Sequence, residues 1–126
     1  MKKEKIEDGV LETWDVKEVA EAMERGEIVL IDVRSPAEYM MEHIEGALLM
    51  PLSFFDAKML PTQDGKRLVF HCGSGVRSEK AARQALGEGL SPIAHLGGGF
   101  AAWKAEGRPF RATDMATGGP KKVPAR

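Results

Sequence analysis

An uninterrupted apolar run, Ile28-Val29-Leu30-Ile31, constrains the fold of this chain more than any other feature. Three of its four residues are β-branched and none is polar, so it predicts a strand that is covered on both faces. Such strands are typical of parallel sheets with helices packed on either side. Ser35-Pro36-Ala37-Glu38 follows closely and has the cap, the proline and the capping-box glutamate of a helix start. The order of strand and helix therefore indicates an α/β protein.

The alternation of strands and helices continues along the chain. Apolar stretches predict four more strands, at 10–14, 47–50, 67–71 and 93–96. Caps, glycines and prolines delimit further helices, at 16–25, 54–60, 77–86 and 100–106. We expect one three-layer α/β domain over residues 10–110, with a mainly parallel five-stranded sheet flanked by helices. Residues 1–9 are expected to form a polar lead-in, and residues 111–126 a flexible basic tail.

Composition excludes several classes of protein. The 126 residues carry a net charge of -1, which gives no reason to expect nucleic acid as a partner. No apolar run approaches the roughly 20 residues that a membrane span needs. The N-terminal residues lack the apolar core of a signal peptide, so a cytoplasmic location is expected. A single cysteine leaves no internal disulfide and no cysteine-rich metal site, and no metal or organic cofactor is expected.

That single cysteine, Cys72, lies where chemistry is favoured. It follows the apolar run Leu68-Val69-Phe70 and begins the stretch Cys72-Gly73-Ser74-Gly75-Val76-Arg77, which leads into a helix. The glycines permit turns that aim backbone N–H groups at one point, and a helix N-terminus favours negative charge there. Both effects favour thiolate over thiol, and a thiolate is the nucleophile of sulfur or phosphoryl transfer. We expect Cys72 to face an open crevice at the carboxyl edge of the sheet.

Other side chains are expected to support this crevice. Gly73, Ser74, Gly75 and Val76 would bind an anion through their backbone, and Arg77 would meet an anionic substrate with its guanidinium group. Asp32 follows a neighbouring strand and is expected to accept hydrogen bonds from loop amides. Arg34 is expected to pair with Glu38, four residues later. His43 and His71 are expected to be packing residues, and none of the three histidines, the third being His95, is expected to bind a metal.

Cys72-x-x-x-x-Arg77 after a buried strand resembles the active-site loop of single-domain rhodaneses. Three more stretches are similar to signatures of that family in the same order: 30–39, 43–47, and 96–103 with Gly107-Arg108-Pro109. The resemblance implies a rhodanese-like fold and a sulfurtransferase. In such an enzyme the Cys72 thiolate takes the outer sulfur of a small anionic donor such as thiosulfate. The Cys72 persulfide then passes this sulfur to a thiol or to cyanide.

Alternatives remain open at this point. Tyrosine-phosphatase-like and arsenate-reductase-like loops are similar but one residue longer, and the shorter loop here suits one extra sulfur atom better than a phosphate. Cys72-Gly73-Ser74-Gly75-Val76 also resembles the loop of mercaptopyruvate sulfurtransferases, although theirs usually ends in Thr where this chain has Arg77. A further possibility is a persulfide carrier or docking module that exchanges sulfur with a sulfur-relay protein.

Overall fold

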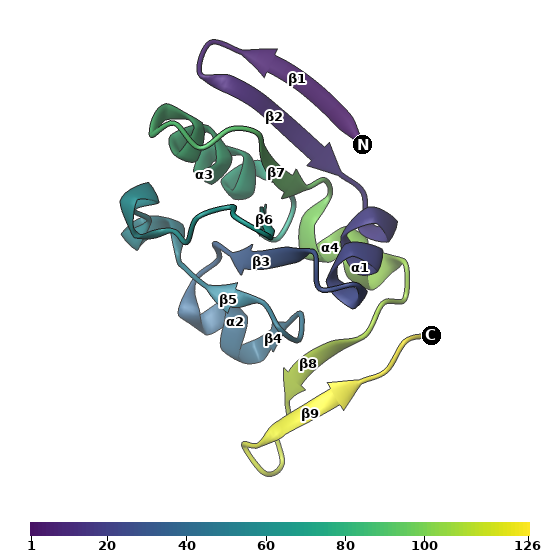
Figure 1. The fold of residues 1–126 in the computed structure, drawn as a ribbon. Coiled ribbons are helices and arrows are strands. Elements are labelled where there is room, and N and C mark those ends of the chain that lie inside the picture. The colour runs from purple at the N-terminus through teal and green to yellow at the C-terminus, as the bar shows by residue number, and fades with distance from the viewer.

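A computed structural model describes all residues, 1–126, and shows a central sheet with helices on both faces (Figure 1). The sheet has six strands, in the order β1 (Lys2–Ile6), β2 (Gly9–Trp14), β7 (Ile93–Leu96), β6 (Arg67–His71), β3 (Ile28–Asp32) and β5 (Leu48–Leu49). Every pair is parallel except β1 with β2. The predicted α/β fold with a mainly parallel sheet is therefore confirmed, and β1 is an additional sixth strand.

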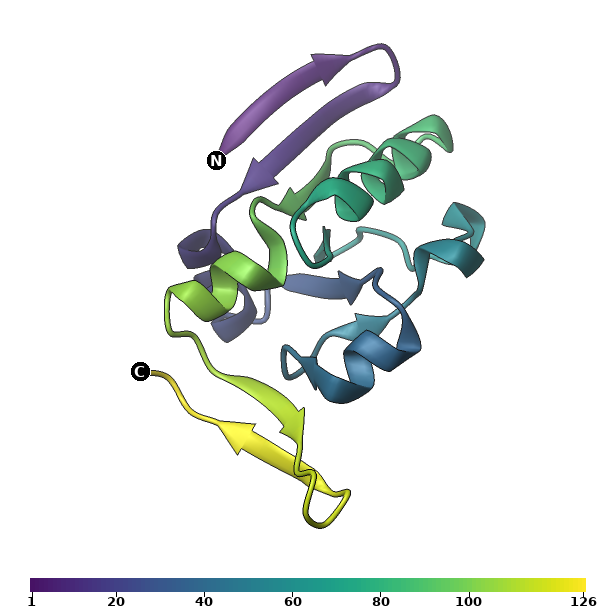
Figure 2. The same cartoon turned by 180° about the vertical axis from the view of Figure 1, so that it is seen from behind.

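Two apolar layers hold the sheet between its helices. On one face, α1 (Val16–Glu24) and α4 (Gly99–Ala105) pack against inward residues of β3, β6 and β7. On the other face, α3 (Val76–Gly87) packs through its small residues. Figure 2 shows the same arrangement from behind, with α1 beside α4 and apart from α3. Ala81, Ala82 and Ala85 are fully buried, so this helix lies close to the sheet, which includes β6, the strand directly before Cys72.

Local capping explains where the first two helices begin. Asp15 and Glu18 form a capping box at α1, and Ser35 and Glu38 form another at α2 (Pro36–Met41), as predicted. The helix expected over 54–60 is instead two short 3-10 turns, η1 (Leu52–Phe54) and η2 (Ala57–Met59). The backbone between these turns is extended at Phe55 and Asp56, which interrupts the helical hydrogen bonds.

Both ends of the chain form strands, which corrects two expectations. The expected polar lead-in contains β1, which pairs antiparallel with β2 from Lys2↔Thr13 to Ile6↔Gly9. The expected flexible tail contains part of a hairpin of β8 (Phe110–Thr113) and β9 (Pro120–Val123), and β8 also pairs with β4 (Glu42–His43). Both predictions were wrong because strand pairing uses backbone groups, whereas the predictions relied on apolar content. No helix is both long and apolar enough to cross a bilayer.

Candidate active site

The carboxyl edge of the sheet brings the predicted site residues together. Asp32 ends β3 and lies opposite His71, the last residue of β6, so Cys72 follows at the same edge. Arg34 comes two residues after Asp32 and folds back onto it. Parallel strands end at a common edge, which is why residues 40 apart in sequence meet here.

The N-terminus of α4 sets the orientation of the Cys72 loop. The backbone N–H of Phe100 donates to the carbonyl of Cys72 at 2.8 Å, and that of Ala101 donates to the carbonyl of Gly73 at 3.0 Å. A Cβ at Gly99 would lie 2.5 Å from the Cys72 carbonyl oxygen, and Gly99 also has a positive φ of 59°. Only glycine permits this close approach. The carbonyls of Cys72 and Gly73 are thus held by α4, while the amides of Gly75 and Ser78 turn toward the sulfur.

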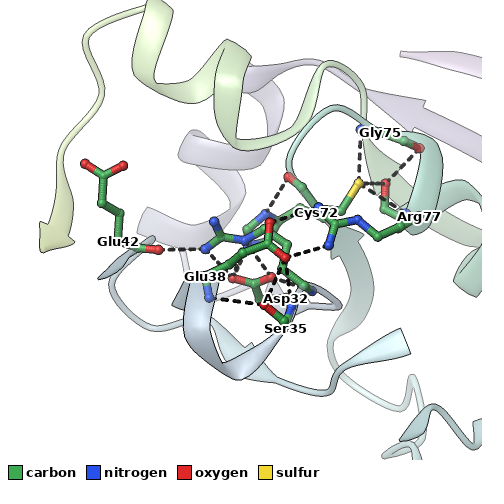
Figure 3. Close-up of polar contacts among 10 residues, drawn as sticks. Asp32, Ser35, Glu38, Glu42, Cys72, Gly75 and Arg77 are labelled. Atoms are coloured by element: carbon green, nitrogen blue, oxygen red, sulfur yellow. Dashed lines mark hydrogen bonds and ion pairs between the residues drawn. The ribbon is translucent and has the colours of Figure 1, made fainter. Parts of the chain in front are cut away.

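Backbone and side-chain groups at the start of α3 converge on the Cys72 sulfur (Figure 3). The amide of Gly75 donates to Sγ at 3.0 Å and the amide of Ser78 at 3.3 Å, while the Ser78 hydroxyl lies 3.6 Å away. Gly75 adopts a positive φ of 112° and begins α3 without any side-chain cap of its own. The sulfur therefore takes the position of a capping acceptor at the start of α3.

This environment favours the thiolate. Burial raises the pKa of the Cys72 thiol, but hydrogen bonds from Ser78, Gly75 and Ser74 lower it by more. The net result is a pKa below the ordinary value of a cysteine. The amides of Gly75 and Ser78 are aimed at Sγ, and the binding of an anion by this loop stays a prediction.

The expected open crevice over Cys72 is not present in the structure. The Cys72 side chain is 0% exposed, although Ser74 and Val76 on the same loop are exposed. A depression of about 360 Å³ lies next to the loop, with Arg77 in its wall and Pro51 and Leu52 of the η1 segment among its other lining residues. The loop backbone covers the sulfur because its amides fold inward to bond it.

Arg77 does not have a free guanidinium group. Its Nη1 lies 2.6 Å from Oε1 of Glu38 and its Nη2 lies 3.0 Å from Oε2 (Figure 3). The hydrogen bond with Arg77 is the main reason that the pKa of Glu38 is lowered to about 2. The expected pair of Arg34 with Glu38 is therefore wrong, because Glu38 points to the loop and Arg34 points into the protein.

Asp32 and Arg34 form a buried ion pair below the site. Arg34 donates from Nε and Nη2 to the Asp32 carboxylate at 2.9 to 3.1 Å, and Asp32 also accepts from the Arg34 backbone at 2.9 Å. The same guanidinium donates to the carbonyl of Glu42 at 2.7 Å and lies over the ring of Phe100 on α4. Arg34 thus links the end of β3 to the helix that orients the Cys72 loop.

The histidines divide into two packing residues and one that contacts the site. His43 stacks on Tyr39, and His71 is fully buried on the α4 face next to Phe100, as expected of packing residues. His95 lies on β7 with its Nδ1 3.0 Å from the hydroxyl of Ser78, which in turn contacts Cys72. Sequence reasoning missed both Ser78 and His95, because nothing in their spacing indicates that they meet. No three His, Cys, Asp or Glu side chains are grouped so as to hold a metal ion.

The comparisons with known proteins agree with this fold and site. The rhodanese-like domain family model matches residues 15–106. A sulfurtransferase from Allochromatium vinosum is 31% identical over 88 residues, which covers 70% of this chain and 82% of that protein. A rhodanese-related protein from Thermoplasma volcanium has a structure that superposes with a TM-score of 0.69 at 26% identity, covering 79% of this chain and 96% of that chain. The chain belongs to the rhodanese-like domain family.

Relatives differ in how much of their length is shared. The Synechocystis protein slr1261 is 39% identical over 100 residues, which covers 79% of this chain but 56% of the relative. In other relatives the matched region makes up 21% to 32% of a longer protein. Rhodanese-like domains of this type therefore occur both as most of a protein and as part of a larger one.

Proposed function

We propose that this protein is a sulfurtransferase that carries sulfane sulfur as a persulfide on Cys72. The observation that carries the proposal is the convergence of the Gly75 and Ser78 donors on one sulfur at the start of α3. A reactive sulfur needs to be ionised near neutral pH, and this environment lowers the pKa of the Cys72 thiol. Family membership and the sulfurtransferase relative support the same chemistry.

The reaction has two displacements. The Cys72 thiolate attacks the outer sulfur of the donor, a new S–S bond forms, and the donor's own bond to that sulfur breaks. The leaving group departs with the electron pair, as sulfite when the donor is thiosulfate. An acceptor thiolate, or cyanide, then attacks the outer sulfur of the persulfide and regenerates the Cys72 thiolate. Gly73, Ser74, Gly75 and Val76 would hold the anionic sulfur through their backbone, and Asp32 and Arg34 would support the loop from below.

Access to Cys72 requires the loop to move. The sulfur is fully buried, so the segment 73–77 shifts outward when a donor approaches. The depression beside Arg77 and Pro51 gives a donor a place next to this segment. When the loop has shifted outward, a sulfur atom added to Cys72 would fill the space that this shift opens. Its negative charge would then face the amides of the displaced loop.

The state of Arg77 bears on the choice of donor. Its charge is compensated by Glu38, and residues 73–76 are uncharged. The loop therefore offers a dianion such as thiosulfate no uncompensated cation of its own. Thiosulfate and mercaptopyruvate remain candidate donors, and a persulfide of lower charge is the donor that this arrangement suits better.

The compensated charge of Arg77 and the uncharged loop also favour a second candidate function, which is a persulfide carrier for a partner protein. Val76 on the loop and Phe54 on η1 are 77% and 78% exposed, so apolar side chains project near a site with little net charge. A sulfur-relay protein carrying its own persulfide would place that sulfur at Cys72 without needing a free cation.

The experiment that separates these candidates compares donors on the purified protein. Thiosulfate and a small thiol persulfide are each supplied with cyanide as acceptor, and the product thiocyanate is followed. An enzyme for small donors turns over many times with at least one of them. A carrier loads Cys72 once per chain and then turns over slowly with both. If neither donor loads Cys72 with sulfur at all, the proposed function is wrong.

A further inference from the structure

A hydrogen-bonded chain of side chains leads away from Cys72 into the protein. The Ser78 hydroxyl lies 3.6 Å from the Cys72 sulfur and 3.0 Å from Nδ1 of His95. Nε2 of His95 lies 3.2 Å from the hydroxyl of Thr13 on β2. Ser78 is fully buried and His95 is 4% exposed, so water does not compete freely for these groups. The chain joins α3, β7 and β2 to the reactive sulfur.

The position of one proton on His95 decides what Ser78 can do. Burial lowers the pKa of His95, so its ring is neutral near pH 7 and carries a single N–H. If that hydrogen is on Nδ1, it is donated to Ser78, and the serine proton is free to point at the sulfur. If the hydrogen is on Nε2, Nδ1 accepts from Ser78, and the serine proton is drawn away from Cys72.

We propose that His95 is a positioning residue for Cys72, which acts through Ser78 by donating from Nδ1 so that the serine hydroxyl donates to the thiolate. The proposal rests on the proposed function only in taking Cys72 as the reactive group. The contact with Thr13 fits the required tautomer, because its hydroxyl can donate to the bare Nε2. The Ser78 hydroxyl also lies 3.1 Å from the carbonyl of Gly75. A thiolate is the stronger acceptor of the two, because hydrogen bonds to a charged group are the stronger ones.

The charged groups around this hydrogen-bonded chain cannot replace the effect of His95 on the Ser78 hydroxyl. Glu79 and Arg83 on α3 and Glu4 on β1 are the charges that act on His95. The pKa of Arg77 is raised mainly by its hydrogen bond with Glu38 and to a smaller extent by the charge of Cys72, so this guanidinium is already paired. None of these side chains donates to Ser78, so the direction of the serine proton depends on His95.

The first test measures how fast Cys72 reacts with iodoacetamide across a pH series. Cys72 is the only cysteine, so the rate reports one thiol. Below the pKa of that thiol, His95→Leu is expected to react about tenfold more slowly, because the serine hydroxyl is no longer held toward the thiolate and donates to the Gly75 carbonyl instead. Ser78→Ala is expected to have the same effect. The double variant is expected to be no slower than Ser78→Ala, because His95 acts only through the serine.

Conservative and control variants separate positioning from general damage. His95→Asn places an amide N–H near the position of Nδ1 and is expected to restore most of the rate. His43→Leu removes a histidine that stacks on Tyr39 and makes no hydrogen bond to Ser78 or Cys72, and it is expected to leave the pH profile unchanged. A profile for His95→Leu equal to that of the wild-type protein would overturn the proposal. So would a double variant in which the two effects simply add.

A second measurement needs no substitution and keeps the proposal testable if His95→Leu does not fold. Nitrogen-15 NMR of the histidine rings distinguishes a protonated ring nitrogen from a bare one. At a pH where Cys72 is ionised, His95 is expected to carry hydrogen on Nδ1 and none on Nε2. Hydrogen on Nε2 in that state would contradict the proposal. Neither measurement involves sulfur transfer, so failure here is distinct from failure of the sulfurtransferase function.

Discussion

Arg77 and Glu38 lie 39 positions apart in sequence and form a two-pronged ion pair beside the Cys72 loop, with N–O distances of 2.6 and 3.0 Å. Arg77 belongs to α3 and Glu38 to α2, so the pair ties together two helices that start at the same edge of the sheet. Glu38 also accepts from the backbone of Ser35 in the capping box. The Glu38 carboxylate thus caps the start of α2 and also compensates the charge of Arg77.

Neutralising Glu38 is expected to change donor preference. Glu38→Gln keeps an oxygen for the Ser35 backbone but leaves the charge of Arg77 uncompensated. We expect the KM for thiosulfate to fall about fivefold, in line with an exposed charge interaction of roughly 1 kcal/mol. Steady-state thiocyanate formation measures this. Glu79→Gln removes another carboxylate from α3 and serves as the control, with no expected change. An unchanged KM in Glu38→Gln would show that Arg77 does not face the donor.

The same pair predicts a pH-dependent contribution to stability. The pKa of Glu38 is lowered from 4.5 to about 2 in the folded protein. The pair therefore stabilises the fold fully above pH 4.5, and this stabilisation is lost as the pH falls from there toward 2. The Glu38 side chain is 38% exposed, so solvent screening limits the contribution to roughly 1 kcal/mol or less. Urea unfolding of the wild-type protein and Glu38→Gln should show a difference at pH 7 that disappears near pH 2.

Gly99 is expected to be intolerant of substitution. In Gly99→Ala the new Cβ meets the backbone of Cys72 and Gly73 at 2.5 to 2.7 Å, in a backbone conformation with positive φ. We expect a loss of about 2 kcal/mol or more in the free energy of unfolding. The Cys72 thiol should also react more slowly with iodoacetamide below its pKa. Gly87→Ala, at the end of α3 with nothing within 4 Å, is the control and is expected to be neutral or slightly stabilising. Equal stability of the two variants would contradict the close approach of α4 to the loop.

Breaking the buried pair below the site is expected to be costly. Asp32→Asn leaves the guanidinium of Arg34, which is 6% exposed, without its carboxylate. We expect the free energy of unfolding to fall by about 3 kcal/mol, measured in urea. Glu79→Gln breaks the exposed pair with Arg83 and should change it by less than about 1 kcal/mol. A small effect of Asp32→Asn would mean that Arg34 finds other acceptors or reaches water.

Elements with a strong local signal were predicted correctly from the sequence. Ile28, Leu30 and Ile31 are buried and Val29 is half-buried, because all four residues of this run are apolar. Ser35 and Glu38 form their capping box within four residues. The hairpin of β8 and β9 has no such signal, since its strands are held by backbone pairing with β4 and with each other. Pairing of this kind depends on where distant segments lie, which composition does not report.

The same distinction holds for the site. Cys72 and its glycine-rich loop are contiguous in sequence, so amides turned toward one point could be predicted from the run itself, and the structure shows the amides of Gly75 and Ser78 aimed at the sulfur. The partner of Arg77 and the contact between Ser78 and His95 depend on how α2, α3 and β7 pack together. Burial of the Cys72 sulfur likewise depends on how the loop folds over it at the start of α3. These features required the three-dimensional structure.

The central claim is that Cys72 carries a transferable sulfur. Intact-mass spectrometry after incubation with a sulfane donor, without reductant, tests it most directly. The account predicts a gain of the mass of one sulfur atom that is lost on addition of a thiol or cyanide. The gain should be absent in Cys72→Ser, with the fold of that variant checked by circular dichroism. A wild-type protein that never gains the atom, or a Cys72→Ser protein that still transfers sulfur, would contradict the account.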